Sequence, residues 1–298
     1  MEEIVKLESV AAYNKMRGVE TLHPLVTIID LSKAKPMPAR TFNFGLYAIY
    51  LKELNCGELK YGRNNYDYQE GTLVFIAPGQ VLGVPPKVKT FEPKGWALLF
   101  DPELIKGTPL GKHIQDYSFF SYDVNEALHL SEKERQIVLD CFAKIEYELQ
   151  QSVDKHSKTL IASNIELFLN YCSRFYDRQF ITRDNTNKGI LERFEDLLNG
   201  YFSSDKPQHT GLPSVAYCAA ELHQSANYFG DLIKKETGKT AQEYIQSKVI
   251  DVSKERIFNH NKSLGEIAYE LGFKYPQHFT RLFKQKVGVS PKEYRRLN

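Results

Sequence analysis

The sequence predicts an α+β protein of two domains: an antiparallel β domain followed by a helix pair, then an all-α domain built from two repeated helical units. The chain of 298 residues is longer than one ordinary domain. Residues 25–100 alternate β-branched and aromatic runs with turn residues, and the C-terminal part repeats itself with a period near fifty residues. With 42% apolar and 26% charged residues, the composition is that of a globular protein.

Five segments within residues 25–100 have the composition of strands: LVTIIDL, FGLYAIYLKEL, GELKYG, TLVFIAP and WALLF. Gly, Pro and Asn turns separate them, and no helical pattern intervenes. Short strands with closely spaced turns favour a jelly-roll or small antiparallel barrel over an α/β sheet.

A helical period begins at Ser131, which forms a capping box with Glu134. Further apolar stripes at helical spacing cover residues 160–175 and 190–201. The helix pair within residues 131–176 fits an internal hairpin and a dimer interface equally well.

The polar stretch SSDKPQHTGLP, residues 203–213, contains two prolines and a glycine and is interpreted as a linker. We therefore expect a first domain at residues 1–180, a helix and linker at 181–211, and a second domain at 212–298.

The C-terminal repeat is the most specific pattern in the chain. SANYFGDLIKKETGKTAQEY, from Ser225, aligns without gaps on YPQHFTRLFKQKVGVSPKEY, from Tyr275. Upstream, VAYCAAEL aligns on LGEIAYEL, so each unit is a short helix, a tight turn and a second helix. Gly272 is placed to end the first helix of the second unit in the left-handed conformation.

Between the units, AQEYIQSKVIDVSKERIFN is predicted to be one connecting helix. A helix of about 18 residues is roughly 27 Å long, comparable with the roughly 34 Å between successive major grooves on one face of DNA.

The second helix of the second unit is predicted to have a core side and a polar side. Phe279, Leu282 and Phe283 are expected to be buried after Pro276 in the first turn. Gln277, Arg281 and Lys284 fall within about 60° of one another on the opposite face. Arg can bind guanine bidentately in the major groove, Gln can do the same for adenine, and Lys can hold phosphates.

Charge supports the same interpretation. From Gly211 onward 14 Lys and Arg face 9 Asp and Glu, whereas the rest of the chain is slightly acidic. The repeat, its turns and its charge together predict a DNA-binding module of two helix-turn-helix units.

The segment SLGEIAYELGFKYPQHFTRLFKQKVGVSPKEYR, with the preceding half SANYFGDLIKKETGKTAQEYI, closely resembles the DNA-binding domain of the AraC/XylS family of bacterial transcription regulators. The resemblance covers residues 212–297. It implies two helix-turn-helix units joined by a linker helix and bound in adjacent major grooves. The DNA-binding residues carried over by position, or flanking those positions, are Asn227, Tyr228, Asp231, Lys234, Gln277, His278, Thr280, Arg281 and Lys284.

The first unit departs from a strong base-reading pattern. Gly230 supplies no side-chain contact, and Asp231 either repels phosphate or accepts a hydrogen bond from cytosine N4. We therefore expect the second unit to carry more of the specificity.

The N-terminal region is similar in layout to the cupin-like effector domain and dimerisation helices of many members of this family. That similarity implies a cupin-like β-barrel that binds a small-molecule effector. The aromatic candidates for a pocket are Phe44, Tyr47, Tyr61 and Trp96, with core packing as the alternative for each. Arg63, Asn64 and Asn65 stand where a metal-binding cupin has two histidines, so we expect no metal and no cofactor.

The sequence thus predicts a homodimeric, sequence-specific transcription regulator rather than an enzyme, with promoter DNA and RNA polymerase as partners. A cytoplasmic location is expected, because no apolar run is long enough to span a bilayer and the N-terminus lacks the pattern of a signal peptide. The four cysteines have no metal-ligand spacing. Two alternatives remain: a metal-independent cupin-type enzyme with an accessory DNA module, and a ligand-independent architectural DNA binder.

Overall fold

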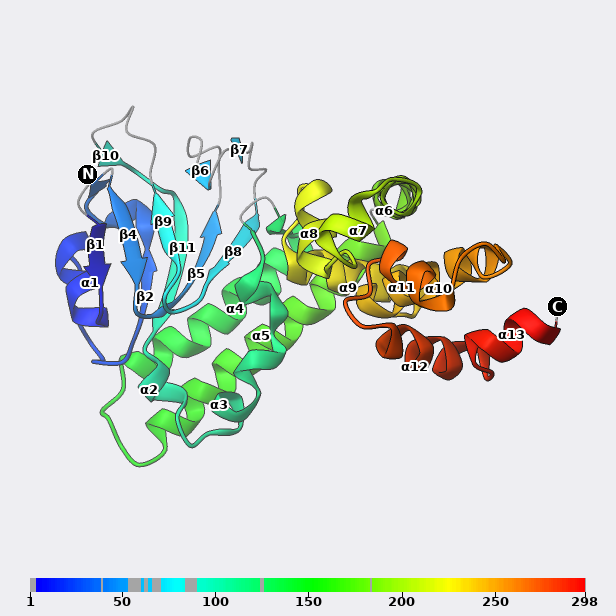
Figure 1. The fold of residues 1–298 in the computed structure, drawn as a ribbon. Coiled ribbons are helices and arrows are strands. Elements are labelled where there is room, and N and C mark those ends of the chain that lie inside the picture. Colours follow the sequence, from blue (N-terminus) through cyan, green and yellow to red (C-terminus); the bar gives the residue numbers. More distant parts are fainter. Residues whose placement is uncertain are drawn as a thin grey trace. The chain divides into compact units, whose positions relative to one another are not determined.

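The computed structural model describes residues 4–38, 40–52, 60–61, 64–65, 71–83, 90–123, 126–182 and 184–297. The chain divides into two compact units, Met1–Thr182 and Arg183–Asn298. The N-terminal unit contains the sheets, and the C-terminal unit is helical (Figure 1). The two-part α+β organisation expected from the sequence is therefore confirmed.

Two main sheets form the N-terminal unit. The smaller sheet has the order β1-β4-β9 and the larger has the order β12-β8-β5-β11-β2. Their strands are β1 (Ile4–Leu7), β2 (Val26–Asp30), β4 (Thr41–Phe44), β5 (Tyr47–Lys52), β8 (Thr72–Ile76), β9 (Val81–Gly83), β11 (Gly95–Phe100) and β12 (Leu128–His129). Two short pairs complete the described strands: β3 (Met37–Pro38) with β10 (Thr90–Phe91), and β6 (Lys60–Tyr61) with β7 (Asn64–Asn65).

A shared core joins the two main sheets. Phe42 and Leu82 of the smaller sheet belong to the same buried cluster as Ala48 and Leu99 of the larger one. Helix α1 (Val10–Arg17) adds Tyr13 to this cluster. Side-chain packing thus links the sheets. Among the described strands no backbone hydrogen bonds close them into the predicted barrel, and β1 pairs with β4 in parallel.

The other face of the larger sheet is covered by helices. Phe75 of β8 lies 4.5 Å from Phe119 and 6.2 Å from Tyr176, measured between ring centroids. Burial on both faces explains why all six residues of β5 are buried. The connecting helical elements are α2 (Pro102–Ile105), α3 (Pro109–His113) and the 3₁₀ turn at Ser118–Ser121.

The predicted helix pair is an internal hairpin of α4 (Glu132–Leu149) and α5 (Ser157–Thr182). Phe142 of α4 packs against Phe168 of α5 with ring centroids 5.2 Å apart. The expected capping box of Ser131 and Glu134 is present in full, with both reciprocal hydrogen bonds. The apolar faces that suggested a hairpin therefore bury each other.

The C-terminal unit consists of eight described helices (Figure 1). They are α6 (Asp184–Ser203), α7 (Lys206–Thr210), α8 (Val215–Glu221), α9 (Ala226–Thr237), α10 (Ala241–Arg256), α11 (Leu264–Glu270), α12 (Pro276–Val287) and α13 (Pro291–Leu297). The segment predicted as a linker instead contains α7, because Pro207 is buried and α7 packs on α6 and α11.

Cys141, Cys172 and Cys218 are free and buried, and Cys56 lies outside the described residues. Within the part of the chain that the structure describes, none of the helices combines the length and apolarity needed to cross a bilayer.

Candidate nucleic-acid interface

The two helix-turn-helix units are closed by the same type of turn. After α8, the Gln224 amide donates to the Ala219 carbonyl at 2.9 Å, and after α11 the Phe273 amide donates to the Ala268 carbonyl at the same distance. These are the long-range bonds of a Schellman motif, which requires a left-handed residue after the helix. Gly272 fills that position with φ 92°, as the sequence predicts, whereas the first unit has His223 with φ 57°.

Helix α12 is anchored by its aromatic side. Phe279 and Phe283 are 1% and 0% exposed, and Phe279 lies 5.4 Å from Phe273 in the turn. Pro276 occupies the first turn as predicted. Leu282 is half-buried rather than fully buried, because it lies at the edge of this apolar stripe.

The opposite side of α12 presents the polar residues to solvent. All five predicted DNA-binding residues of the second unit are exposed, namely Gln277, His278, Thr280, Arg281 and Lys284. Arg281 and Lys284 form no ion pair with any residue that the structure describes. Their charges are therefore available to an external anion such as a DNA phosphate or to the acceptor edge of a base.

Helix α9 of the first unit is more deeply buried. Asn227 and Lys234 are exposed and Asp231 is half-buried, but Tyr228 is only 4% exposed. The helix also packs on α6, whose Phe194 meets Phe229 edge-on with ring centroids 4.9 Å apart. Tyr228 therefore cannot offer its ring to a base in this conformation.

Capping boxes fix the starts of three helices in this unit. The pairs are Thr240 with Glu243, Ser263 with Glu266, and Ser290 with Glu293. Hydrogen bonds from the capping residue lower the pKa of each glutamate. In the sequence, Ser or Thr followed three residues later by Glu is the signal for these caps, as it is at Ser131.

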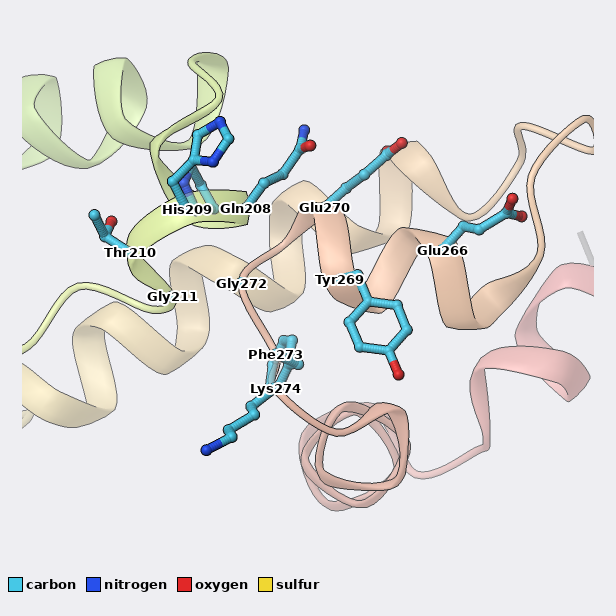
Figure 2. Close-up of a pocket in the computed structure, with 11 residues that line it drawn as sticks. Gln208, His209, Thr210, Gly211, Glu266, Tyr269, Glu270, Gly272, Phe273 and Lys274 are labelled. Carbon is cyan, nitrogen blue, oxygen red and sulfur yellow. The ribbon is translucent and has the colours of Figure 1, made fainter.

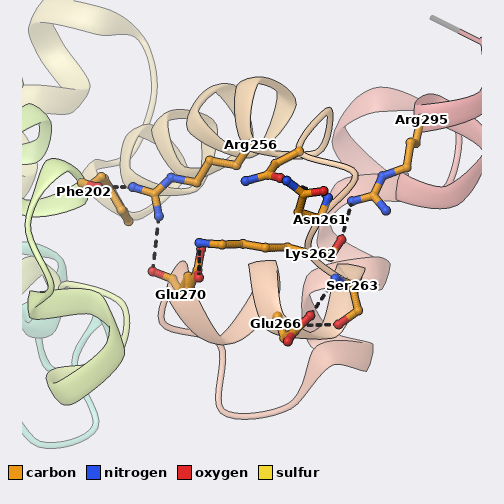
Figure 3. A network of polar contacts seen from close by, with 9 residues as sticks. Phe202, Arg256, Asn261, Lys262, Ser263, Glu266, Glu270 and Arg295 are labelled. Atoms are coloured by element: carbon orange, nitrogen blue, oxygen red, sulfur yellow. Dashed lines mark hydrogen bonds and ion pairs between the residues drawn. The ribbon is translucent and has the colours of Figure 1, made fainter.

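A polar network holds α6, α10 and α11 together (Figure 3). Arg256, at the end of α10, donates to the carbonyl of Phe202 and, at 3.4 Å, to the carbonyl of Glu270. The Glu270 carboxylate pairs with Lys262. Arg256 thus links the end of α6 to the first helix of the second helix-turn-helix unit.

The basic residues of α13 have two different roles, one in packing and one at the surface. Arg295 donates from Nε to the Ile257 carbonyl at 2.6 Å and from Nη2 to the Lys262 carbonyl at 3.2 Å. It therefore contributes to packing of the domain. Lys292 and Arg296 are exposed and add to the positive surface.

A hollow of about 700 Å³ lies between α7 and α11 (Figure 2). Glu266, Tyr269 and Glu270 line it from α11, and Gln208 and His209 line it from α7. Two carboxylates on its wall make it unsuited to a DNA phosphate, so the exposed face of α12 is the better candidate interface.

Two of the aromatic residues predicted to line an effector pocket, Phe44 and Tyr47, lie in different layers of the N-terminal unit. Phe44 is fully buried in the core between the sheets. Tyr47 stacks on Phe100, with centroids 4.9 Å apart, and meets Phe120 of the helical layer on the other face. Phe44 belongs to β4 of the smaller sheet, whereas Tyr47 belongs to β5 of the larger sheet and faces the helical layer.

The other two candidates are Trp96 and Tyr61. Trp96 is half-buried and pairs in register with Leu51, four residues along β5 from Tyr47. The backbone of Tyr61 belongs to β6, but its side chain lies outside the described residues, as do Arg63 and the side chains of Asn64 and Asn65.

Comparison with known proteins agrees with the C-terminal geometry. Residues 218–297 match a family model described as "Helix-turn-helix domain". The chain is 32% identical over 141 residues to the uncharacterized HTH-type transcriptional regulator YfiF of Bacillus subtilis, covering 47% of this chain and 41% of YfiF. It is 30% identical over 103 residues to the bifunctional transcriptional activator/DNA repair enzyme AdaA of the same organism, covering 35% of this chain and 47% of AdaA. Each match spans less than half of the relative.

Among solved structures, a transcriptional regulator of Chromobacterium violaceum, described as AraC-type DNA-binding domain-containing, aligns with 18% identity and a TM-score of 0.33. The alignment covers 37% of this chain and 93% of that one. Three sequence motifs lie in the elements described above. The first, IAYELGF at residues 267–273, spans the end of α11 and the turn. The second, FTRLFK at 279–284, lies in α12, and the third, GVSPKEYR at 288–295, leads into α13. The family match and these placed motifs identify residues 218–297 as a helix-turn-helix domain of the AraC type.

Proposed function

We propose that this protein is a sequence-specific DNA-binding transcription regulator. The observation that carries the proposal is the two-sided character of α12: Phe279 and Phe283 hold the helix to the domain while Gln277 and Arg281 face solvent. A helix that presents an amide and a guanidinium on one exposed face matches the donor and acceptor pattern of the major groove.

The exposed residues are assigned different roles. Arg281 pairs with guanine and Gln277 with adenine, because these side chains form bidentate contacts with those bases. The residues beside Arg281 and Gln277 contact the sugar-phosphate backbone of the DNA; they are Lys284, His278 and Thr280. In the first unit, Asn227 and Lys234 are the exposed candidates, and Asp231 lies half-buried next to them.

The connecting helix supports binding to two groove segments. Helix α10 has 16 residues and is therefore about 24 Å long. That length separates two recognition helices by a distance of the same order as the roughly 34 Å between successive major grooves.

The N-terminal unit is proposed to bind a small-molecule effector and to mediate a homodimer. Leu160 and Leu167 of α5 are 45% and 40% exposed although they are large and apolar. They are seven residues apart and so lie on one face of the helix, outside the hairpin core. A second copy of the chain would cover this face, and promoter DNA with RNA polymerase completes the proposed set of partners.

A DNA-binding experiment with the full chain tests the central proposal. A site is first selected from a random duplex library, and affinity is then measured for that site and for a scrambled duplex. Arg281→Ala is expected to cost about 1–3 kcal/mol on the selected site and much less on the scrambled one. Lys284→Ala is expected to weaken both equally and to reduce the salt dependence by about one phosphate contact.

Lys286→Ala is the matched control, because Lys286 is an exposed lysine of the same helix at about 180° from Gln277. Equal losses on both duplexes for Arg281→Ala would remove its base-reading role. Failure of the full chain to select any duplex at low salt would refute the proposed function.

A further inference from the structure

The residue that precedes α12 does not cap the helix. Tyr275 has the extended conformation of an N-cap, with φ −133° and ψ 121°, but its side chain forms no hydrogen bond with the helix. Ser225 stands at the aligned position of the first unit, and its hydroxyl accepts from the Tyr228 amide at 3.2 Å. Short side chains with an oxygen are favoured at N-caps because they satisfy an amide that the helix leaves unpaired. Tyrosine at position 275 therefore costs helix stability.

The Tyr275 ring does not belong to the core either. It is 46% exposed, whereas Phe279 of the same helix is 1% exposed. His278 meets the ring edge-on with centroids 5.5 Å apart, and Nζ of Lys274 lies 5.8 Å from the ring centroid. Both of these neighbours are themselves exposed. An exposed tyrosine is ordinary on its own, but this one occupies a position where a capping residue would stabilise the fold.

Tyr275 lies at the end of α12 that is expected to enter the DNA. In a helix-turn-helix unit, the N-terminal residues of the recognition helix contact the base edges. Tyr275 comes directly before the turn that carries the exposed Gln277 and His278. Lys274, on its other side, supplies a charge for a phosphate. The ring thus provides apolar surface among side chains that are polar or charged.

We propose that Tyr275 is a further specificity-determining residue, whose ring packs against the C5-methyl group of a thymine beside the bases read by Gln277 and Arg281. The thymine methyl is the apolar group that the bases present in the major groove, and contact with it distinguishes thymine from cytosine. Burial of the ring against this methyl offsets the missing cap only when DNA is bound. This role rests on the proposed function, because it requires that α12 reads DNA.

Tyr275→Ser separates this role from a structural one, because it is expected to change stability and binding in opposite directions. Serine supplies the missing cap, so the unfolding midpoint of the C-terminal unit, measured by calorimetry of the full chain, is expected to rise by about 2 to 4 °C. The affinity for the selected duplex is expected to fall at least about fourfold, since the ring contact is lost. A fall in both quantities would indicate a structural role and contradict the proposal.

Uracil identifies the methyl group. Each thymine of the selected duplex is replaced in turn by uracil, which lacks only the C5 methyl. In the half of the site where Arg281→Ala abolishes base preference, one replacement is expected to weaken binding of the unchanged chain about fourfold, the effect of one buried methyl group. The same replacement is expected to leave the affinity of Tyr275→Ser unchanged. Tyr275→Phe retains the ring, so it is expected to keep both the affinity and the uracil penalty.

Tyr269→Ser is the matched control. Tyr269 is another tyrosine of the same unit and is 54% exposed, but it lies inside α11 rather than before a recognition helix (Figure 2). The substitution therefore adds no cap, and the variant is expected to keep the uracil penalty of the unchanged chain.

Three further results would overturn the role of Tyr275. One is that no uracil replacement in that half of the site weakens binding of the unchanged chain. Another is a uracil penalty that persists in Tyr275→Ser. The third is an equal loss of affinity in Tyr275→Phe and Tyr275→Ser, which would assign the contact to the hydroxyl. Each leaves the proposed function standing if Arg281→Ala still loses affinity for the selected duplex alone. Failure to select any duplex refutes the proposed function and this role with it.

Discussion

Gly272 and Gly211 meet backbone to backbone in the C-terminal unit. A Cβ atom added at position 272 would lie 2.7 Å from the carbonyl carbon of Gly211 and 2.9 Å from its oxygen. Gly272 also has φ 92°, in the left-handed region. The turn of the second helix-turn-helix unit is therefore seated against the segment that follows α7.

Gly272→Ala is expected to destabilise the C-terminal unit by about 3 kcal/mol. The left-handed conformation accounts for about 1–2 kcal/mol, and the collision with the backbone at Gly211 accounts for the rest. Calorimetry of the full chain would measure this loss of stability. Trp96, the single tryptophan, lies in β11, so its fluorescence identifies the unfolding transition of the N-terminal unit. Gly288→Ala is the control, since its φ is 91° but an added Cβ would meet no atom within 4 Å. Equal losses for both variants would show that the contact with Gly211 is unimportant.

His223→Gly is expected to stabilise the same unit by up to about 1 kcal/mol. His223 occupies the turn position that Gly272 fills in the second unit, and a side chain there costs more than glycine. His223→Ala keeps the Cβ and is expected to give no gain. A rise in the calorimetric midpoint for both variants would mean that the imidazole itself, rather than the backbone, is unfavourable.

Arg256→Met is expected to cost about 1–2 kcal/mol and to weaken DNA binding. The substitution removes charge-assisted hydrogen bonds to the carbonyls of Phe202 and Glu270, which join α6 and α11 to α10 (Figure 3). Lys254→Met is the control, because Lys254 forms a surface ion pair with Asp251, and such pairs contribute about 0–1 kcal/mol. Indistinguishable unfolding curves for the two variants would contradict the role given to Arg256.

Stability of the C-terminal unit is expected to fall in acid through its capping boxes. The pKa values of Glu243, Glu266 and Glu293 are lowered by hydrogen bonds in the folded state. A depressed folded pKa gives stability that is present above the ordinary value of 4.5 and is lost as the pH falls through the folded value.

The triple variant with glutamine at these three positions is therefore expected to lose less stability between pH 7 and pH 3 than the unchanged chain. Glu255→Gln, an exposed glutamate of α10 for which the structure gives no cap, keeps the full dependence. Parallel pH profiles for the triple variant and the unchanged chain would show that the caps do not titrate with folding.

The helical domain was predictable because its signals are local. Gly272, Pro276 and the spacing of Phe279 and Phe283 specify a turn and an amphipathic helix within a dozen residues. The longer strands of the larger sheet, β2, β5, β8 and β11, were predictable for a similar reason, since each is a largely apolar run between turn residues.

Features that depend on distant contacts were not predictable. Tyr228 aligns with the exposed His278 but is only 4% exposed, so equivalent positions of the repeat differ in burial. Gly211 and Gly272 are 61 residues apart along the chain, so the sequence around one glycine does not predict its contact with the other. The separation of Phe44 from Tyr47 follows from which sheet each strand joins, and that choice is made by the core as a whole.

The burial of Tyr228 in α9 has a consequence for the DNA that this protein is proposed to select. Helix α12 exposes more polar side chains than α9 does. The half of the DNA site that α12 contacts is therefore expected to be read with greater base discrimination than the half that α9 contacts. We expect a binding motif that is strict over one helical turn and permissive over the next, and mutations in the permissive half to be silent in living cells.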